Sequence, residues 1–260
     1  MTILNKPVKR RQFLKSMMAA GVSLPLLNSP ILAKDKPAIK KSIPKSGELI
    51  PVIGMGSSRT FDVYDDEDLQ KLLPVLQAFF DKGGALIDSS PMYGSSEKVI
   101  GDLLKQVKNK GALFSATKVW IDGKREGVSQ MQNSMKLWGV NKFDLMQIHN
   151  LRDWEVHLDT LRQWKADGKI RYIGITTSHG RFHEDLENIL ETEDAFDFVQ
   201  FSYNLANRDV EARLLPIAGE KGIATLINRP FQRGSMFSKV KGKPLPNWAQ
   251  LLSVITWWIT

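Results

Sequence analysis

Short β-prone runs alternate with stretches of helical spacing through most of this 260-residue chain. In the stretches between the runs, apolar residues recur every three or four positions, as on one face of an amphipathic helix. Strands that alternate with helices predict βαβ units and a mainly parallel sheet. The predicted strands are Val52–Gly54, Ala85–Ile87, Leu113–Thr117, Leu145–Ile148, Ile170–Ile175, Phe196–Phe201 and Ile223–Ile227.

Helical spacing is clear in four of the intervening segments, and Pro74 inside the first of them predicts a kink or an end to that helix. Glycines at the joins, such as Gly139, are typical of helix C-caps. Upstream, residues 43–52 predict two short extended pieces around a Ser-Gly turn. The four helical segments are 69–80, 99–107, 158–164 and 210–218.

Polar residues at the strand ends distinguish a closed barrel from an open doubly wound sheet. Residues 54–59 lack the third glycine of the dinucleotide-binding fingerprint, which argues against the open form. Five successive predicted strands end in ionisable or amide side chains, and in a (β/α)8 TIM barrel the carboxyl ends of the strands form one rim that carries the chemistry. We therefore predict an α/β TIM barrel. The strand-end residues are Asp88, Thr117, Lys118, Gln147, His149, Asn150, Thr176, Thr177, Gln200 and Tyr203.

Composition excludes several classes of function. The absence of cysteine excludes disulfides, thiolate zinc sites and a cysteine nucleophile. The formal net charge of +8 includes five cations and no acid before residue 34, which leaves +3 for the remainder. Because the later charges alternate in sign, they indicate an ordinary solvated surface, and nucleic acid is not expected as a partner.

The N-terminal segment predicts an export signal. Arg10 and Arg11 precede Phe13 and Leu14, and a short apolar run leads to small residues near Ala33. This order resembles a twin-arginine signal, with the export machinery as partner and the periplasm as destination. The apolar run is too short to span a bilayer, so stable membrane insertion is not expected. We assign residues 1–33 to the signal and 34–42 to a linker; a basic N-terminal arm is the alternative.

Four segments carry a family resemblance. Residues 86–94 contain the spacing D-x-x-x-x-Y-G, with Glu97 just beyond, and Thr117-Lys118 ends the next strand. Residues 144–149 then end in histidine, and 168–175 lead into the following strand. This combination resembles the aldo/keto reductase family over about residues 43–240. The resemblance implies a barrel domain at 43–260 that transfers hydride between NADPH and a small carbonyl substrate.

The resemblance also implies roles for four residues. Tyr93 would protonate the carbonyl oxygen, but a free tyrosine, with a pKa near ~10, is a weak acid at neutral pH. Lys118 would lower that pKa because a buried ammonium favours the phenolate. Asp88 would keep Lys118 charged and oriented, and His149 would donate a hydrogen bond to the carbonyl.

Further residues are expected around the cofactor and the substrate. Gln200 and one of Thr176 and Thr177 would hold the nicotinamide carboxamide. Trp120 and Tyr64 are predicted walls of the substrate pocket, with core packing as the alternative for Trp120. The complete predicted cofactor set is Gly56, Ser57, Asn150, Thr176, Thr177, Gln200, Asn228 and Arg229.

The chain departs from the family pattern in three places. Thr176-Thr177 stands where the family usually has Ser-Asn, and residues 228–234 replace an aromatic residue followed by Ser-Pro-Leu. Either Arg229 or Arg233 is expected to contact the cofactor pyrophosphate, with a surface salt bridge as the alternative. No eighth strand is found before Thr260, so we expect a truncated copy that lacks that strand and the C-terminal segment.

Two other functions compete with a reductase. The departures favour a catalytically weak barrel that binds a nucleotide or a partner, whereas the four intact residues favour an enzyme. A metal-dependent hydrolase is suggested by the spacing of His179 and His183, but no carboxylates complete such a site, so no metal is predicted.

Overall fold

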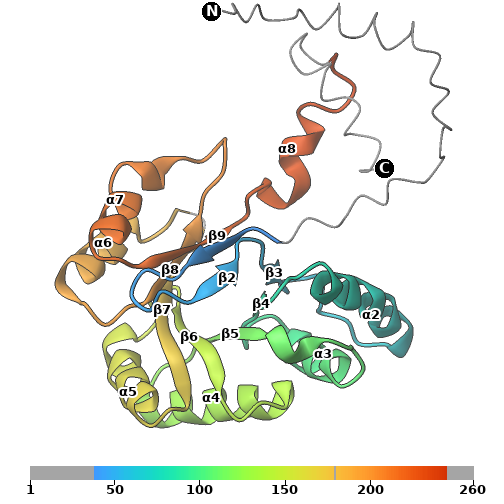
Figure 1. Cartoon of the computed structure of the whole chain (residues 1–260). Coiled ribbons are helices and arrows are strands. Elements are labelled where there is room, and N and C mark those ends of the chain that lie inside the picture. Colours follow the sequence, from blue (N-terminus) through green and yellow to red (C-terminus); the bar gives the residue numbers. More distant parts are fainter. Residues whose placement is uncertain (1–37, 179, 245–260) are drawn as a thin grey trace, which may run out of the picture. The chain divides into compact units, whose positions relative to one another are not determined.

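Seven parallel strands form a nearly closed barrel in the computed structural model, which describes residues 38–178 and 180–244 (Figure 1). Each strand pairs with the next along the sequence, from β3 to β9. This architecture matches the predicted TIM barrel for seven strands, and the described residues contain no eighth strand in the sheet. The strands are β3 (Met55–Gly56), β4 (Leu86–Asp88), β5 (Phe114–Val119), β6 (Phe143–His149), β7 (Ile170–Thr176), β8 (Phe198–Ser202) and β9 (Ala224–Asn228).

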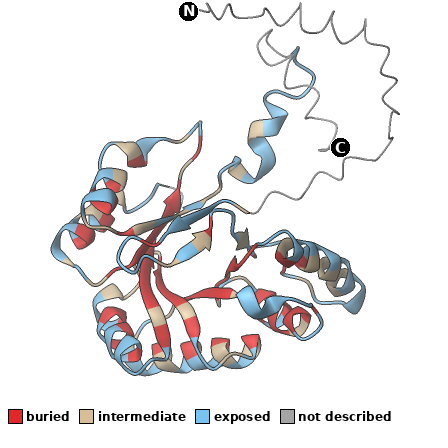
Figure 2. Cartoon of the chain, in the orientation of Figure 1, coloured by how far each residue is buried: buried red, intermediate tan, exposed pale blue. Residues whose placement is uncertain are grey.

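Helices follow the strands and bury one face against the sheet (Figure 2). The four predicted helices form, although the last is split into a short turn and a helix that begins at Leu214. Pro74 lies inside the first helix without ending it. The helices are α2 (Asp66–Asp81), α3 (Ser96–Leu104), α4 (Lys124–Trp138), α5 (Trp154–Ala166), α6 (His183–Thr192), α7 (Leu214–Glu220) and α8 (Ser235–Ser238), with 3-10 turns at Lys110–Ala112, Asp209–Glu211 and Gln232–Gly234.

Helices α4 and α6 were not predicted from the sequence. In α4 only a narrow line of residues is buried, including Met131, Ser134 and Trp138, and most other positions are polar. The helix ends at Gly139, which has a φ of 68° and donates its N–H to carbonyls of the last turn. This left-handed C-cap confirms the role expected of that glycine.

An antiparallel hairpin precedes the barrel and packs against its amino-terminal end. Strands β1 (Lys40–Ser42) and β2 (Leu49–Pro51) flank the turn, which places Ile43 in an apolar cluster with residues of the barrel interior. Two sequence predictions are therefore wrong: residues 40–42 are a strand rather than linker, and 52–54 are irregular. The latter residues connect the hairpin to β3 and pair with no neighbouring strand.

Polar contacts attach the hairpin to the barrel. Glu48 accepts a hydrogen bond from the Tyr172 hydroxyl at 2.5 Å and forms an ion pair with Arg171. Arg171 in turn contacts Asp144 at 2.7 Å. Because Asp144 lies on β6 and the other two partners on β7, the hairpin fixes the starts of two neighbouring strands.

Several predictions concern residues outside the described ranges. This group comprises the export signal at 1–33, residues 34–37 of the linker, His179 and the C-terminal residues from 245 onward. Within the described residues, no helix is both long and apolar enough to cross a bilayer. Nor does this part of the chain bring together three histidine or acidic side chains that could hold a metal ion.

Close packing of α3 on α4 generates a stability prediction. A Cβ on Gly101 would lie 1.9 Å from the carbonyl oxygen of Leu137, so Gly101→Ala is expected to lower the free energy of unfolding by about 1–3 kcal/mol or more. Gly219 lies in α7 with nothing within 4 Å of its Cβ position. Gly219→Ala is therefore the matched control and should raise stability by about 0.5–1 kcal/mol. Urea unfolding measures both; equal effects would contradict the packing argument.

Candidate active site at the carboxyl ends of the strands

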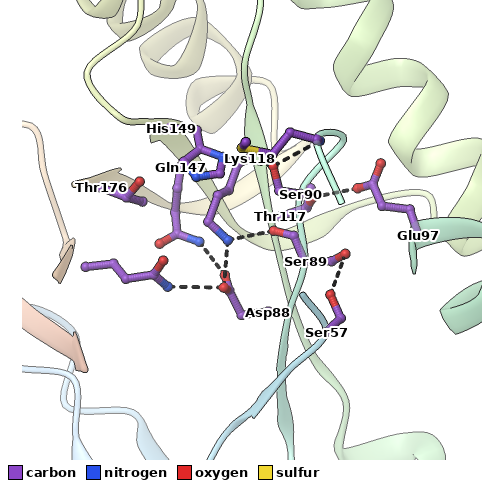
Figure 3. Close-up of polar contacts among 12 residues, drawn as sticks. Ser57, Asp88, Ser89, Ser90, Glu97, Thr117, Lys118, Gln147, His149 and Thr176 are labelled. Atoms are coloured by element: carbon purple, nitrogen blue, oxygen red, sulfur yellow. Dashed lines mark hydrogen bonds and ion pairs between the residues drawn. The ribbon is translucent and has the colours of Figure 1, made fainter. Parts of the chain in front are cut away.

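A buried ion pair forms the centre of the site (Figure 3). Lys118 of β5 is fully buried, and its Nζ lies 2.6 Å from Oδ2 of Asp88 at the end of β4. The same ammonium donates to the carbonyl of Ser89 at 2.7 Å. Burial acts to lower the pKa of Lys118, but Asp88 and Tyr93 outweigh it, so the pKa is raised and Lys118 stays charged. The predicted pairing of Asp88 with Lys118 is present in the structure.

Two amide side chains also donate hydrogen bonds to the Asp88 carboxylate. Gln147 of β6 donates to Oδ1 at 2.8 Å, and Gln200 of β8 donates to Oδ2 at 3.2 Å. The carboxylate therefore receives hydrogen bonds from β5, β6 and β8 while lying on β4 itself. This arrangement fixes the Asp88 side chain in one orientation.

Tyr93 lies in the loop between β4 and α3, beside the ion pair. Its ring centroid is 5.2 Å from Nζ of Lys118 and 5.8 Å from the His149 ring, which it meets edge to face. Burial raises the pKa of Tyr93 above its ordinary value, and Lys118 acts in the opposite direction with a smaller effect. The expected influence of Lys118 is thus present, but the net pKa is raised, so the phenol keeps its proton at neutral pH.

His149 ends β6 and is held by Ser90. The Nδ1 atom lies 2.9 Å from Oγ of Ser90, which itself accepts a hydrogen bond from the N–H of Met92 at 3.3 Å. We therefore infer that Ser90 donates its proton to Nδ1, which leaves the proton on Nε2. Burial, aided by Lys118, lowers the pKa of His149 to about 2. The imidazole is consequently neutral and can donate a hydrogen bond from Nε2.

The predicted cofactor residues of β6 and β7 lie next to this centre. In strand register Thr176 faces His149 on one side and Gln200 on the other. The hydroxyl of Thr176 accepts from the N–H of Asn150 at 3.2 Å. Thr177 donates its N–H to the carbonyl of Gln200 at 2.9 Å, while its own buried hydroxyl has no partner. An unsatisfied buried hydroxyl at this rim suits a ligand with an amide group.

Gly56 and Ser57 occupy the end of β3. Gly56 pairs with Asp88 across the sheet, and the space above its Cα is open. Ser57 is fully buried and donates its hydroxyl to that of Ser89 at 2.8 Å. Gly56 therefore borders the site directly, whereas Ser57 supports the loop that follows Asp88.

A cavity of about 270 Å³ lies beyond the ends of β8 and β9. The side chain of Asn228 is held beside this cavity by Ser202, whose hydroxyl donates to its Oδ1 at 2.6 Å. Arg229 is half-buried, and burial followed by the charges of Arg233 and Arg59 lowers its pKa. Two guanidinium groups at one cavity suit an anionic ligand. The lining residues are Ser202, Asn204, Asn207, Arg229, Gln232 and Arg233.

The two predicted pocket walls differ in placement. Trp120 is half-buried with its ring 6.5 Å from that of His149, and the guanidinium of Arg152 lies 4.9 Å from the indole. Trp120 thus lies beside His149, and its role as a wall of the substrate pocket stays a prediction. Tyr64 is 82% exposed and hydrogen-bonded to Asp62, and the structure shows no contact between it and the four central residues.

Two residues with clear contacts in the site had been given no role by the sequence, although Gln147 was among the predicted strand-end residues. Ser90 orients His149, and Gln147 holds Asp88. Gln147 had a usable signal, because it lies two residues before His149 and side chains two apart in a strand share a face. Ser90 had none, since its contact depends on the path of the loop after β4.

Comparisons with known proteins agree with this geometry. The model of the Aldo/keto reductase family matches residues 52–250. The chain is 27% identical over 188 residues to aldo-keto reductase YhdN of Bacillus subtilis, a match that covers 66% of this chain and 56% of the relative. It is 25% identical to methylglyoxal reductase YeaE of Escherichia coli over 74% of this chain and 68% of the relative.

Solved structures share the fold. An aldo/keto reductase from Klebsiella pneumoniae in complex with NADP and acetate superposes with a TM-score of 0.69 at 21% identity, covering 82% of this chain and 77% of the other. The first of the curated relatives is matched over little more than half its length.

The lowered pKa of His149 predicts acid sensitivity. Because the folded-state pKa lies below the ordinary value of 6.5, the unfolded chain binds the proton first as the pH falls. His149 should therefore remove up to ~1.4 kcal/mol of stability per pH unit below about 6.5. Urea unfolding at pH 7.5, 6.5 and 5.5 is expected to give a flatter pH dependence for His149→Gln than for the unmodified chain. Parallel curves would contradict the assignment.

Proposed function

The chain belongs to the aldo/keto reductase family, and on that premise we propose that it reduces an aldehyde or ketone with NADPH and uses Tyr93 as the proton donor. The observation that carries this proposal is the buried ion pair of Lys118 and Asp88 beside Tyr93. A neutral histidine, His149, lies at the edge of the same phenol ring. These groups together suit protonation of a carbonyl oxygen as it becomes negatively charged.

The residues at the rim fit the proposed cofactor. The unpartnered hydroxyl of Thr177, with Thr176, Gln200 and Asn150 around it, offers polar groups for an amide. Just after β9, Arg229 lines the cavity that suits phosphates, and Asn228 at the strand end accepts a hydrogen bond from another lining residue, Ser202. Bound NADPH would supply the hydride that reduces the carbonyl carbon, and the protein would supply orientation and electrostatics.

Each of the four central residues has a separate task in the proton transfer. The Nε2–H of His149 would donate to the carbonyl oxygen and orient it. The Tyr93 hydroxyl, held protonated by its raised pKa, would then give its proton to that oxygen. Lys118 would stabilise the phenolate left behind, and Asp88 would keep the ammonium charged through both steps.

One observation favours a weaker alternative, a barrel that binds nucleotide without useful turnover. Asn228 occupies the position where the family resemblance implies an aromatic residue, and its side chain is engaged by Ser202. The complete central group argues for the enzyme. Binding without turnover would support the alternative.

Tyr93→Phe tests the proposed reaction. The variant should bind NADPH, followed by cofactor fluorescence, but should lose about 100- to 10,000-fold in kcat with small aldehydes, because it cannot donate a proton. Asp88→Asn should lose less, since Asp88 acts through Lys118. Turnover by Tyr93→Phe at the unmodified rate would rule out Tyr93 as the donor. Binding with no turnover in either protein would instead favour the nucleotide-binding barrel.

The arginine-lined cavity generates a second test. Arg229→Gln and Arg233→Gln are each expected to raise the Kd for NADPH by about 10-fold and to weaken its dependence on salt, because each removes a cation from the phosphate side of the site. Arg125→Gln is the matched control, since Arg125 is exposed and pairs with its neighbour Glu126. Fluorescence titration at two salt concentrations measures the effect. Equal Kd values for all three variants would place the phosphates elsewhere.

A further inference from the structure

Glu97 is a buried carboxylate that the proposed reaction does not use. It is the second residue of α3 and is 3% exposed. Its Oε1 accepts from the Thr117 hydroxyl at 2.5 Å and from Nε1 of Trp138 at 3.2 Å, and its Oε2 accepts from the Ser134 hydroxyl at 2.9 Å. These four residues, the Glu97 cluster, join α3 to β5 and α4. Burial raises the pKa of Glu97, and the three donors oppose that effect.

The Glu97 cluster is adjacent in sequence to the active site through Thr117. Thr117 precedes Lys118 in β5, and side chains that are neighbours in a strand point to opposite faces. Lys118 points toward Asp88 inside the barrel, so Thr117 points outward to α3 and α4. Figure 3 shows Glu97 and Thr117 together on the side away from Asp88. One short piece of β5 therefore makes both contacts.

The loop that carries Tyr93 is tied to this piece of β5 at both ends. Residues 89–95 connect β4 to α3. At the start of the loop, Asp88 forms the ion pair with Lys118 at 2.6 Å. Just past its end, Glu97 accepts the hydrogen bond of Thr117 at 2.5 Å. Two neighbouring residues of one strand thus hold the two ends of the loop between which Tyr93 lies.

We propose that Glu97 is a positioning residue which, through Thr117, fixes the loop bearing Tyr93 against the strand bearing Lys118 and so sets the distance between the Tyr93 hydroxyl and the Lys118 ammonium. A carboxylate suits this task because it accepts all three hydrogen bonds at once, and hydrogen bonds to a charged acceptor are the stronger ones. The inference rests on the proposed function for its kinetic consequence, whereas the geometry can be tested without turnover.

The cluster contains its own matched control. Thr117→Val and Ser134→Ala each remove one hydroxyl from Glu97, but only Thr117 lies on the strand of Lys118. Both variants should lose a similar amount of thermal stability. Thr117→Ser keeps the hydroxyl and should restore the properties of the unmodified chain. Glu97→Ala should reproduce Thr117→Val, and combining the two changes should add little, because they break the same contact.

Two measurements separate positioning from folding. The chain has four tyrosines, which can be labelled with ¹³C for NMR. The Tyr93 signal is assigned by its absence from the spectrum of Tyr93→Phe. The Tyr93 ring signals should shift in Thr117→Val and stay in place in Ser134→Ala, with no cofactor present. In turnover with NADPH and an aldehyde, Thr117→Val should lower kcat about 10-fold or more and move the alkaline limb of its pH profile, whereas Ser134→Ala should do neither.

The outcomes distinguish this inference from the proposed function. Tyr93 signals that move equally in both variants, or in neither, would overturn the positioning role of Glu97. If the signals move only in Thr117→Val while no variant and no unmodified chain turns over, the positioning role stands and the reductase proposal fails. Should Glu97→Ala not fold, the comparison of Thr117→Val with Ser134→Ala still decides.

Discussion

The ion pair between Lys118 and Asp88 is the contact on which the rest of the site depends. An ammonium with no exposed surface is costly to bury unless it is paired and hydrogen-bonded. Lys118 meets both conditions, because it contacts the Asp88 carboxylate and the carbonyl of Ser89. The carboxylate is satisfied in turn by Gln147 and Gln200. Removal of any one member would take a hydrogen bond away from a buried polar group, so these side chains hold each other in place.

The ion pair also affects the protonation of two neighbouring groups, His149 and Tyr93, in different ways. Burial and the charge of Lys118 both disfavour a protonated His149, so this ring stays neutral and acts only as a hydrogen-bond donor. For Tyr93 the two effects oppose each other: burial disfavours the phenolate and Lys118 favours it. The phenol therefore holds its proton, and in the proposed reaction the ammonium that would stabilise the phenolate is already in position. A single buried cation thus serves both residues.

Strands β4 to β9 could be predicted from the sequence because their signals are local, whereas the roles of the four central residues came from the family resemblance of the segments that carry them. Strand ends such as Asp88 and His149 are visible as polar residues after apolar runs, and parallel strands bring such ends to one rim. Other features depend on packing between distant segments. The strand at 40–42 forms by pairing with β2. In α4 the few buried residues are separated by polar ones, so the sequence shows no clear apolar face. The contact between Ser90 and His149 likewise depends on a loop path that no periodicity encodes.

The residues that depart from the family pattern at and after the end of β9 all lie at the same end of the barrel. Asn228 turns its side chain to Ser202, so a flat apolar surface is lost at that strand end. Arg229 and Arg233 line the cavity beside it, and Arg59, from the loop after β3, is close enough to influence the charge of Arg229. The pKa of Arg229 is lowered chiefly by burial, and the charges of Arg233 and Arg59 act in the same direction. If NADPH binds as proposed, its affinity at this end of the barrel should depend on phosphate charge more than on stacking against a ring.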